Sequence, residues 1–365
     1  MNEFENARSV FKEFDFQVVV RAVIEGSSPG KIWVDDPLDP QCGFMATREG
    51  WFLAGDPSVK KFNQGLRNLV HDMIIKQDFY SPIDPKFISY LFFHIDIDSW
   101  KSKFPEIFDI RFPPLPTHRV HLVCNEVSLD WKNNIPEGFR LLHIDSTLDI
   151  ESLDIPKDIE DWMEYRLDYE ITLGFGMCLV HENKIVVWVN ADCTSGKECE
   201  LGIFTTRDYR LKGLGALTAA ATVEHCFSLG YSAVGWHCED HNYGSLGVAH
   251  KVGFIKERDY VHYICMFSEA EHVAEKAMRH FYAQEYGEAI ADFERAFRIG
   301  EVPTWSYILA ARAYATNKEV GTVIKYLNKA IDVGWENWNH VINSDELALI
   351  QDNEDFKDFI RLLNK

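Results

Sequence analysis

The sequence is short of positive charge, of long apolar runs and of paired cysteines, and each shortage excludes a class of protein. Its 365 residues carry 37 Lys and Arg against 57 Asp and Glu, and this net charge of −20 disfavours nucleic acid as a partner. No apolar run reaches the roughly 18 residues of a membrane span, and the opening residues lack the cationic start and apolar core of a secretion signal. The eight cysteines contain no CxxC pair, which favours reduced thiols over a disulfide framework. We therefore expect a cytoplasmic protein with no membrane partner.

The remaining composition is typical of compact globular domains, with 46% hydrophobic and 26% charged residues. A chain of this length exceeds the usual size of one domain, so two or three are expected. The motifs described below place their boundaries at 1–133, 134–267 and 268–365.

A spacing of 34 residues recurs in the last of these segments. Ala277 recurs as Ala311, and Phe293 recurs as Leu327. Small residues at fixed positions let two helices approach closely, while the larger ones fill the layer between them. The pattern resembles the tetratricopeptide repeat, a helix–turn–helix unit of this length, over about two copies. We interpret the shorter apolar stretch that follows as a capping helix pair. A groove that binds a protein and a module that only packs both remain open.

Residues 138–267 alternate between strand-like and helix-like patterns. The turn-like Glu182-Asn183 predicts a β-hairpin, and Gly230 is a good left-handed end for a helix. The predicted strands are 139–144, 174–181, 184–191, 199–206, 232–238 and 258–267. The predicted helices are 155–169, 214–229 and 243–252.

The loop between the strand at 199–206 and the helix at 214–229 carries the clearest chemistry. Gly213 and Gly215 remove side chains where the chain turns into the helix, whose first amides point outward and attract anions. Arg207, Arg210 and Lys212 reverse the sign of charge locally in an acidic protein. The loop therefore suits a polyphosphate, although it has neither the GK[ST] of a P-loop nor the GxGxxG of a dinucleotide fold.

Two blocks in this region resemble the GNAT superfamily of acyl-CoA-dependent N-acyltransferases. The first is the R-x-x-G-x-G pattern of Arg210, Gly213 and Gly215, which resembles the family's pyrophosphate loop. The second is the N-x-x-S … G-F run at 242–254. With the block 235–238 and the long chain, they are similar to a subgroup with tandem GNAT-like halves that includes the zwittermicin A resistance acetyltransferase. The resemblance implies an α/β (α+β) fold with a mixed sheet flanked by helices, in tandem, followed by the all-α tetratricopeptide-like domain.

The resemblance also implies acetyl-CoA as the co-substrate. The backbone of Ile203, Phe204 and Thr205 would pair with the pantetheine arm like an added strand, and Asn242 would reach the pantetheine or the thioester. The strands around Thr205 and Cys238 would splay apart and leave a slot for the acyl group. The amides that would hold the pyrophosphate are those of Arg210, Leu211, Lys212, Gly213, Leu214 and Gly215.

The catalytic groups are less clear from the sequence. An acceptor ammonium must lose a proton before it attacks the thioester, and Glu200, with Glu198 as its same-face alternative, and His237 are the candidate bases. The tyrosine that often serves the family as general acid is replaced by Ala249, so another group or solvent protonates the thiolate, or the domain is inactive. Tyr243, His250 and Tyr260 lie nearby in sequence, but none has the family's spacing. The spacing of His237, Cys238 and His241 is too weak a metal motif, and no metal is predicted.

The first third of the chain lacks the R-x-x-G-x-G pattern. Its order of predicted elements fits a degenerate copy of the same fold, and we expect a structural role, over a sheet edge or as one wall of the acceptor pocket. Residues 113–116, with three prolines, predict a stiff connector. The predicted strands are 16–24, 31–34, 43–47, 51–54, 89–95 and 119–123, and the predicted helix is 59–75.

These patterns favour an acetyl-CoA-dependent N-acetyltransferase that moves the acetyl group directly to a primary amine. Residues 145–170 contain ten acids and two bases, which favours a small cationic metabolite or antibiotic as acceptor, although a solvated helix face explains them equally well. One alternative is a protein acyltransferase that captures its substrate with the tetratricopeptide-like domain. Another is a non-catalytic acyl-CoA-binding interaction protein, consistent with Ala249.

Overall fold

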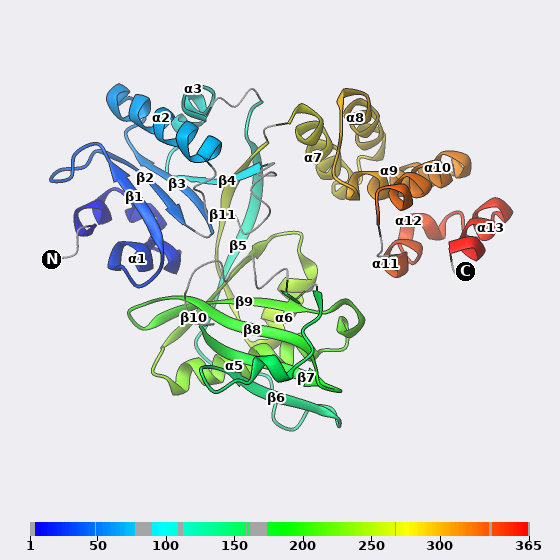
Figure 1. Ribbon diagram of the computed structural model, residues 1–365, viewed down its shortest axis with the longest axis horizontal. Helices are drawn as coiled ribbons and strands as arrows, with labels where there is room; N and C mark the ends of the chain where they lie inside the picture. The colour runs from blue at the N-terminus through cyan, green and yellow to red at the C-terminus, as the bar shows by residue number, and fades with distance from the viewer. Residues whose placement is uncertain are drawn as a thin grey trace. The chain divides into compact units, whose positions relative to one another are not determined.

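The computed structural model describes residues 4–47, 49–76, 90–108, 112–157, 159–160, 174–266, 268–335 and 338–363. The chain forms two compact units, one of Met1–Asp109 with Pro116–Ile264 and one of Ile110–Leu115 with Cys265–Lys365 (Figure 1). No described helix has both the length and the apolar character that crossing a bilayer requires. All eight cysteines are buried free thiols, as expected from their spacing.

A single eleven-stranded sheet organises the larger unit, in the order β1-β2-β3-β4-β11-β5-β10-β9-β8-β7-β6 (Figure 1). Most of the pairs are antiparallel, whereas β3–β4 and β9–β10 are parallel. The first third of the chain therefore extends the sheet of the middle third instead of covering its edge. The strands are β1 Gly30–Val34, β2 Cys42–Thr47, β3 Gly50–Gly55, β4 Tyr90–Ile95, β5 Leu115–Cys124, β6 Phe139–Ile144, β7 Phe175–His181, β8 Lys184–Ser195, β9 Glu198–Thr205, β10 Ala233–Glu239 and β11 Ile255–Met266.

Helices flank this sheet, and α5 is the most deeply buried of those that shape the site. It packs against β7, β8 and β9. The hydroxyls of Thr218 and Thr222 bond carbonyls one turn back, at 3.0 and 2.9 Å, so their polarity is satisfied inside the helix. Gly230 follows its end with φ +95°. The helices are α1 Val18–Glu25, α2 Lys60–Lys76, α3 Phe104–Phe108, α5 Leu214–Ser228 and α6 Tyr243–Val252, with short 3₁₀ turns at Glu5–Ser9, Lys12–Phe14, Asp98–Lys103, Ile150–Ser152 and Arg207–Tyr209.

The elements predicted for the middle third are confirmed where the structure describes them, with boundaries shifted by up to four residues. Glu182 and Asn183 have φ of 49° and 66°, the left-handed pair that a tight hairpin between β7 and β8 needs. The predicted helix at 155–169 lies mostly outside the described residues.

Two predictions for the first third are wrong. The run 16–24 is not a strand, since Val18–Glu25 forms α1, with six of its eight residues buried. An apolar run of this length suits a buried strand and a buried helix equally, and Gly26, left-handed at φ 77°, ends it as a helix. The connector at 113–116 is shorter than predicted, because β5 already begins at Leu115.

The smaller unit consists of helices. The repeated positions Ala277, Ala311, Phe293 and Leu327 are all fully buried, which gives the 34-residue spacing a packing reason. In the described part of this unit, three shorter helices follow the four longer ones, where one pair was predicted. The helices are α7 Glu269–Tyr282, α8 Tyr286–Ile299, α9 Trp305–Thr316, α10 Val320–Asp332, α11 Trp338–Ile342, α12 Asp345–Ala348 and α13 Glu354–Leu363.

Candidate active site

The loop before α5 combines an open helix start with a close approach of backbone to strand. Gly213 precedes the helix at φ +80°, and a Cβ there would meet no atom within 4 Å. Gly215 lies in the first turn, and a Cβ there would come within 3.1 Å of the Thr205 hydroxyl. The first turn of a helix leaves N–H groups without helical partners. The two glycines thus bring those groups to an open surface beside β9.

A pocket of about 510 Å³ lies at this helix start, between β9, α5 and α6. Of the ten residues predicted to bind the co-substrate, all but Phe204 and Lys212 line it. The Phe204 side chain packs with the core cluster around Trp188 instead, so only its backbone remains a candidate. The Lys212 ammonium lies over the Tyr209 ring at 5.1 Å.

Three polar groups shape the walls of this pocket. The Arg210 Nε donates to the Thr205 carbonyl at 2.8 Å, which fixes that side chain to the end of β9. The Asn242 side chain accepts from the Ser245 amide at 3.1 Å and thereby caps α6. Lys251, in the last turn of α6, adds a cation that the sequence analysis missed. The sequence feature that could have identified Lys251 is its position two residues before the glycine-phenylalanine block at 253–254.

The strands beside the pocket part along their length. The parallel pairing of β9 and β10 runs from Glu198↔Ala233 to Glu200↔Gly235. Beyond it β9 continues through Thr205, while β10 stays paired with β5 as far as Glu239. This is the place where a slot between strands was predicted. Desolvation raises the pKa of the Cys238 thiol there, which argues against its use as a nucleophile.

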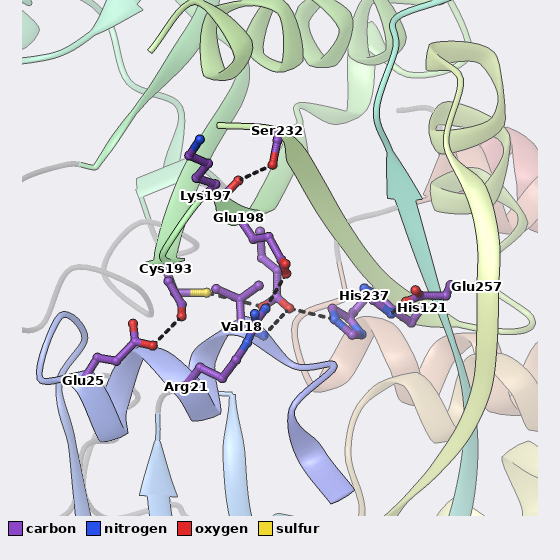
Figure 2. Close-up of polar contacts among 12 residues, drawn as sticks. Val18, Arg21, Glu25, His121, Cys193, Lys197, Glu198, Ser232, His237 and Glu257 are labelled. Carbon is purple, nitrogen blue, oxygen red and sulfur yellow. Dashed lines mark hydrogen bonds and ion pairs between the residues drawn. The ribbon is translucent and has the colours of Figure 1, made fainter. Parts of the chain in front are cut away.

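The two predicted catalytic residues lie in contact on the face of the sheet that α1 covers. The Glu200 Oε1 is 2.9 Å from the His237 Nε2 and accepts from the Val18 amide at 2.8 Å, while Oε2 accepts from the Cys193 thiol at 3.3 Å. In Figure 2, dashed lines mark these contacts of the Val18 backbone N–H, the Cys193 thiol and the His237 ring. Burial opposes the charge of Glu200, but His237 and the two other donors outweigh it and lower the pKa of Glu200 to about 2.

Further ring groups surround His237. Its Nδ1 is 3.0 Å from the Tyr260 hydroxyl, and its ring stacks on that of His121 with centroids 4.3 Å apart. Since Glu200 is ionised, the Nε2 of His237 donates to it, while the Nδ1 shares a hydrogen bond with the Tyr260 hydroxyl. The Tyr260–His237–Glu200 chain has the geometry to move one proton and to stabilise the imidazolium that results.

His121 lies in the same buried cluster. Its Nδ1 is 2.9 Å from the Glu257 carboxylate. Burial, with the nearby His237 as the next cause, lowers the pKa of His121 to about 4. His121 was not singled out from the sequence, because it comes from β5, distant in sequence from β9. Tyr260, on β11, was considered only as a general acid in place of Ala249.

The cluster also raises the question of a metal. Ligand atoms of His121, Glu200 and His237 all lie within 4.8 Å of one another. However, the two imidazole rings are stacked with their planes only 7° apart, so their lone pairs lie in separate, nearly parallel planes and cannot both be directed at one ion. Of the other candidate ligands, Cys238 belongs to the core on the opposite face, and His241 contacts its neighbour Asp240 at 3.1 Å.

The remaining candidates have structural surroundings. Glu198 forms an ion pair with Arg21 of α1. Ala249, at the position where the resemblance implies a general acid, is fully buried in the core between α6 and the sheet.

A family model described as GNAT acetyltransferase matches residues 8–263. A curated relative, "Uncharacterized N-acetyltransferase YdfB" of Bacillus subtilis (strain 168), is 25% identical over 72% of this chain and 95% of its own length. The crystal structure of a GCN5-related N-acetyltransferase-like protein from Streptococcus suis 89/1591 matches with a TM-score of 0.51 and 20% identity, covering 72% of this chain and 98% of the other. A tandem GNAT protein from the clavulanic acid biosynthesis pathway matches with a TM-score of 0.41 and 11% identity, covering 72% and 96%.

Proposed function

Because this chain belongs to the GNAT acetyltransferase family, we propose that it transfers the acetyl group of acetyl-CoA directly to a primary amine. The observation that carries the proposal is the pocket of about 510 Å³ where the start of α5 meets the parting strands β9 and β10. Gly215 supports the assignment, since a Cβ there would lie only 3.1 Å from the Thr205 hydroxyl and would occupy part of the pocket.

Each part of the pocket suits one part of acetyl-CoA. The N–H groups from Leu211 through Gly215 bind the pyrophosphate, and Lys251 adds a compensating positive charge. The Arg210 N–H, which was also predicted to bind it, donates to the Arg207 carbonyl at 3.1 Å instead. The backbone of 203–205 pairs with the pantetheine arm, and Asn242 lies beside it. The thioester then enters the slot between β9 and β10, next to the face that carries Glu200 and His237.

His237 is the proton acceptor in this scheme. A proton of the acceptor amine passes through the Tyr260 hydroxyl to the Nδ1 of His237, and Glu200 stabilises the resulting imidazolium. The free amine attacks the thioester carbonyl, an amide bond forms, and the C–S bond breaks to release the CoA thiolate. The nitrogen loses its second proton to water as the amide forms. Ordinary thiols have a pKa of about 8.5, so water can protonate this thiolate without a tyrosine at the position of Ala249.

The acceptor we favour is a small cationic amine, such as a metabolite or an antibiotic. The proposal rests on the acid-rich stretch 145–170, of which 158 and 161–170 lie outside the described residues. For the smaller unit we infer a tetratricopeptide-like array, supported by the buried positions spaced 34 residues apart. A cytoplasmic location fits the eight free thiols.

The substitution Gly213→Glu tests the pocket. We expect the Kd for acetyl-CoA, measured by calorimetry, to rise at least about tenfold, since one misplaced negative charge beside a pyrophosphate costs that much or more. The matched control is Gly230→Glu, at the other end of α5, where the glycine is also left-handed and has no atom within 4 Å of an added Cβ. Equal affinity in the two variants, or no binding by the wild type, would refute the proposed site.

A further inference from the structure

The first third of the chain reaches the catalytic pair through three consecutive residues. The Phe16 ring packs near His237 and Tyr260, with centroids 6.2 and 5.2 Å away. Gln17 precedes α1 in an extended conformation, and Val18 is the first residue of the helix. These residues come from outside the middle third, which holds the loop and both catalytic candidates.

The start of α1 has an unusual cap. Gln17 makes no side-chain bond to the helix, because its amide lies 3.3 Å from the buried His94 ring. The open Val18 N–H donates to the Glu200 Oε1 at 2.8 Å instead. A carboxylate on β9 therefore takes the place of the usual capping side chain, and the positive end of the helix faces its charge.

Several further bonds fix α1 on the β8–β9 hairpin. Arg21 pairs with Glu198, two residues before Glu200 (Figure 2). The Ser195 hydroxyl donates to Glu25 at 2.9 Å, and the Ser27 hydroxyl just after the helix donates to a carbonyl of β8 at 2.9 Å. These contacts span the length of the helix and leave it little freedom to shift along the hairpin.

Cys193 completes the surroundings of the carboxylate from the opposite side. It follows the irregular pairing of β8 and β9 between Ala191 and Cys193, and this irregularity places its thiol 3.3 Å from the Glu200 Oε2. Each carboxylate oxygen thus has a fixed donor besides His237. The orientation of Glu200, and through it that of the imidazole, depends on α1.

We propose that α1 is a positioning element of the acetyltransferase centre, so that the first third of the chain completes the active site rather than only extending the sheet. This inference rests on the proposed function. In the proposed centre, the Val18 N–H keeps Glu200 ionised and directed at the His237 Nε2. The Nδ1 on the other side of the imidazole then receives the proton through Tyr260.

Val18→Pro removes this donor and puts the ring Cδ where the N–H points, so it also displaces the Glu200 carboxylate, which lies 2.8 Å from that nitrogen. Proline is tolerated at the first position of a helix, and the extended Gln17 before it (φ −94°, ψ 112°) suits a residue preceding proline. Val18→Ala keeps the N–H and loses more of the buried side chain, so it is the matched reference. Relative to Val18→Ala, we expect Val18→Pro to lower kcat about tenfold and to leave the Kd for acetyl-CoA within about twofold.

A second measurement does not depend on turnover. With its helix donor gone and its carboxylate displaced, Glu200 is no longer held toward the imidazole, so the His237 Nε2–H proton resonance moves upfield in Val18→Pro and not in Val18→Ala. Equal kcat and equal resonance positions in the two variants overturn the inference. If the wild type binds no acetyl-CoA, the proposed function fails, and the resonance comparison still decides whether α1 positions the pair.

Discussion

Replacing His237 by glutamine is expected to lower kcat for acetyl transfer by about 10²–10⁴-fold, the range typical of a lost acid–base group. Glutamine can still donate to Glu200, which lies 2.9 Å from the imidazole, but it cannot take up a proton. The acetyl-CoA pocket is lined by other residues, so its Kd should stay within about twofold. The measurement is CoA release with a panel of small primary amines, beside calorimetry with acetyl-CoA.

The control for this variant is His241→Gln. His241 lies just beyond the same strand, is exposed, and contacts the carboxylates of its neighbours Glu239 and Asp240. It should keep the wild-type kcat. Full activity in His237→Gln would show that no proton passes through this imidazole and would leave direct loss to solvent as the mechanism.

The loop before α5 could be predicted because its chemistry is local. Gly213 and Gly215 stand within three residues of one another, and the neighbouring strand and helix have clear patterns. Glu200 and His237 were also named from the sequence. Their contact was not, since it depends on how far β9 and β10 stay paired, and that is a property of the whole sheet.

The rest of the centre depends on the order of the strands. His121 stands directly opposite His237 because β5 pairs with β10 across more than a hundred residues of chain. Tyr260 comes from β11, on the other side of β5. The valine-rich run beginning at Val18 gave no periodic signal that separates helix from strand, so its amide could not be placed beside Glu200. The contacts between the first and middle thirds could therefore not be predicted, because the sequence gives the residues but not which of them meet in the fold.

Acidification is expected to destabilise the larger unit in two successive steps. His121 is neutral in the folded state, where its pKa is about 4, whereas in the unfolded chain its pKa is near 6.5. Its contribution is therefore complete above pH 6.5 and is lost between pH 6.5 and 4, by about 3 kcal/mol. Glu200 has a folded pKa of about 2 against 4.5 when unfolded, so its contribution is lost between pH 4.5 and 2. Buried His94, whose pKa is also lowered by desolvation, adds to the first step.

Hydrogen exchange of the slowest amides of β5 and β10, measured from pH 7 to pH 4, reports this loss as a fall in opening free energy. In His121→Asn the fall should shrink by about 3 kcal/mol, because the group that protonates on unfolding is gone. His118→Asn is the matched control, since His118 is an exposed histidine on the same strand, and it should show the full wild-type fall in opening free energy.

The surroundings of His121 explain why its pKa is lowered. Burial is the largest cause, the nearby His237 and Arg258 oppose its protonation, and Glu200 compensates only in part. If the fall in opening free energy between pH 7 and pH 4 is the same in His121→Asn as in the wild type, the imidazole is already protonated at pH 7 through its contact with Glu257. The buried cluster then carries one more positive charge than its geometry implies.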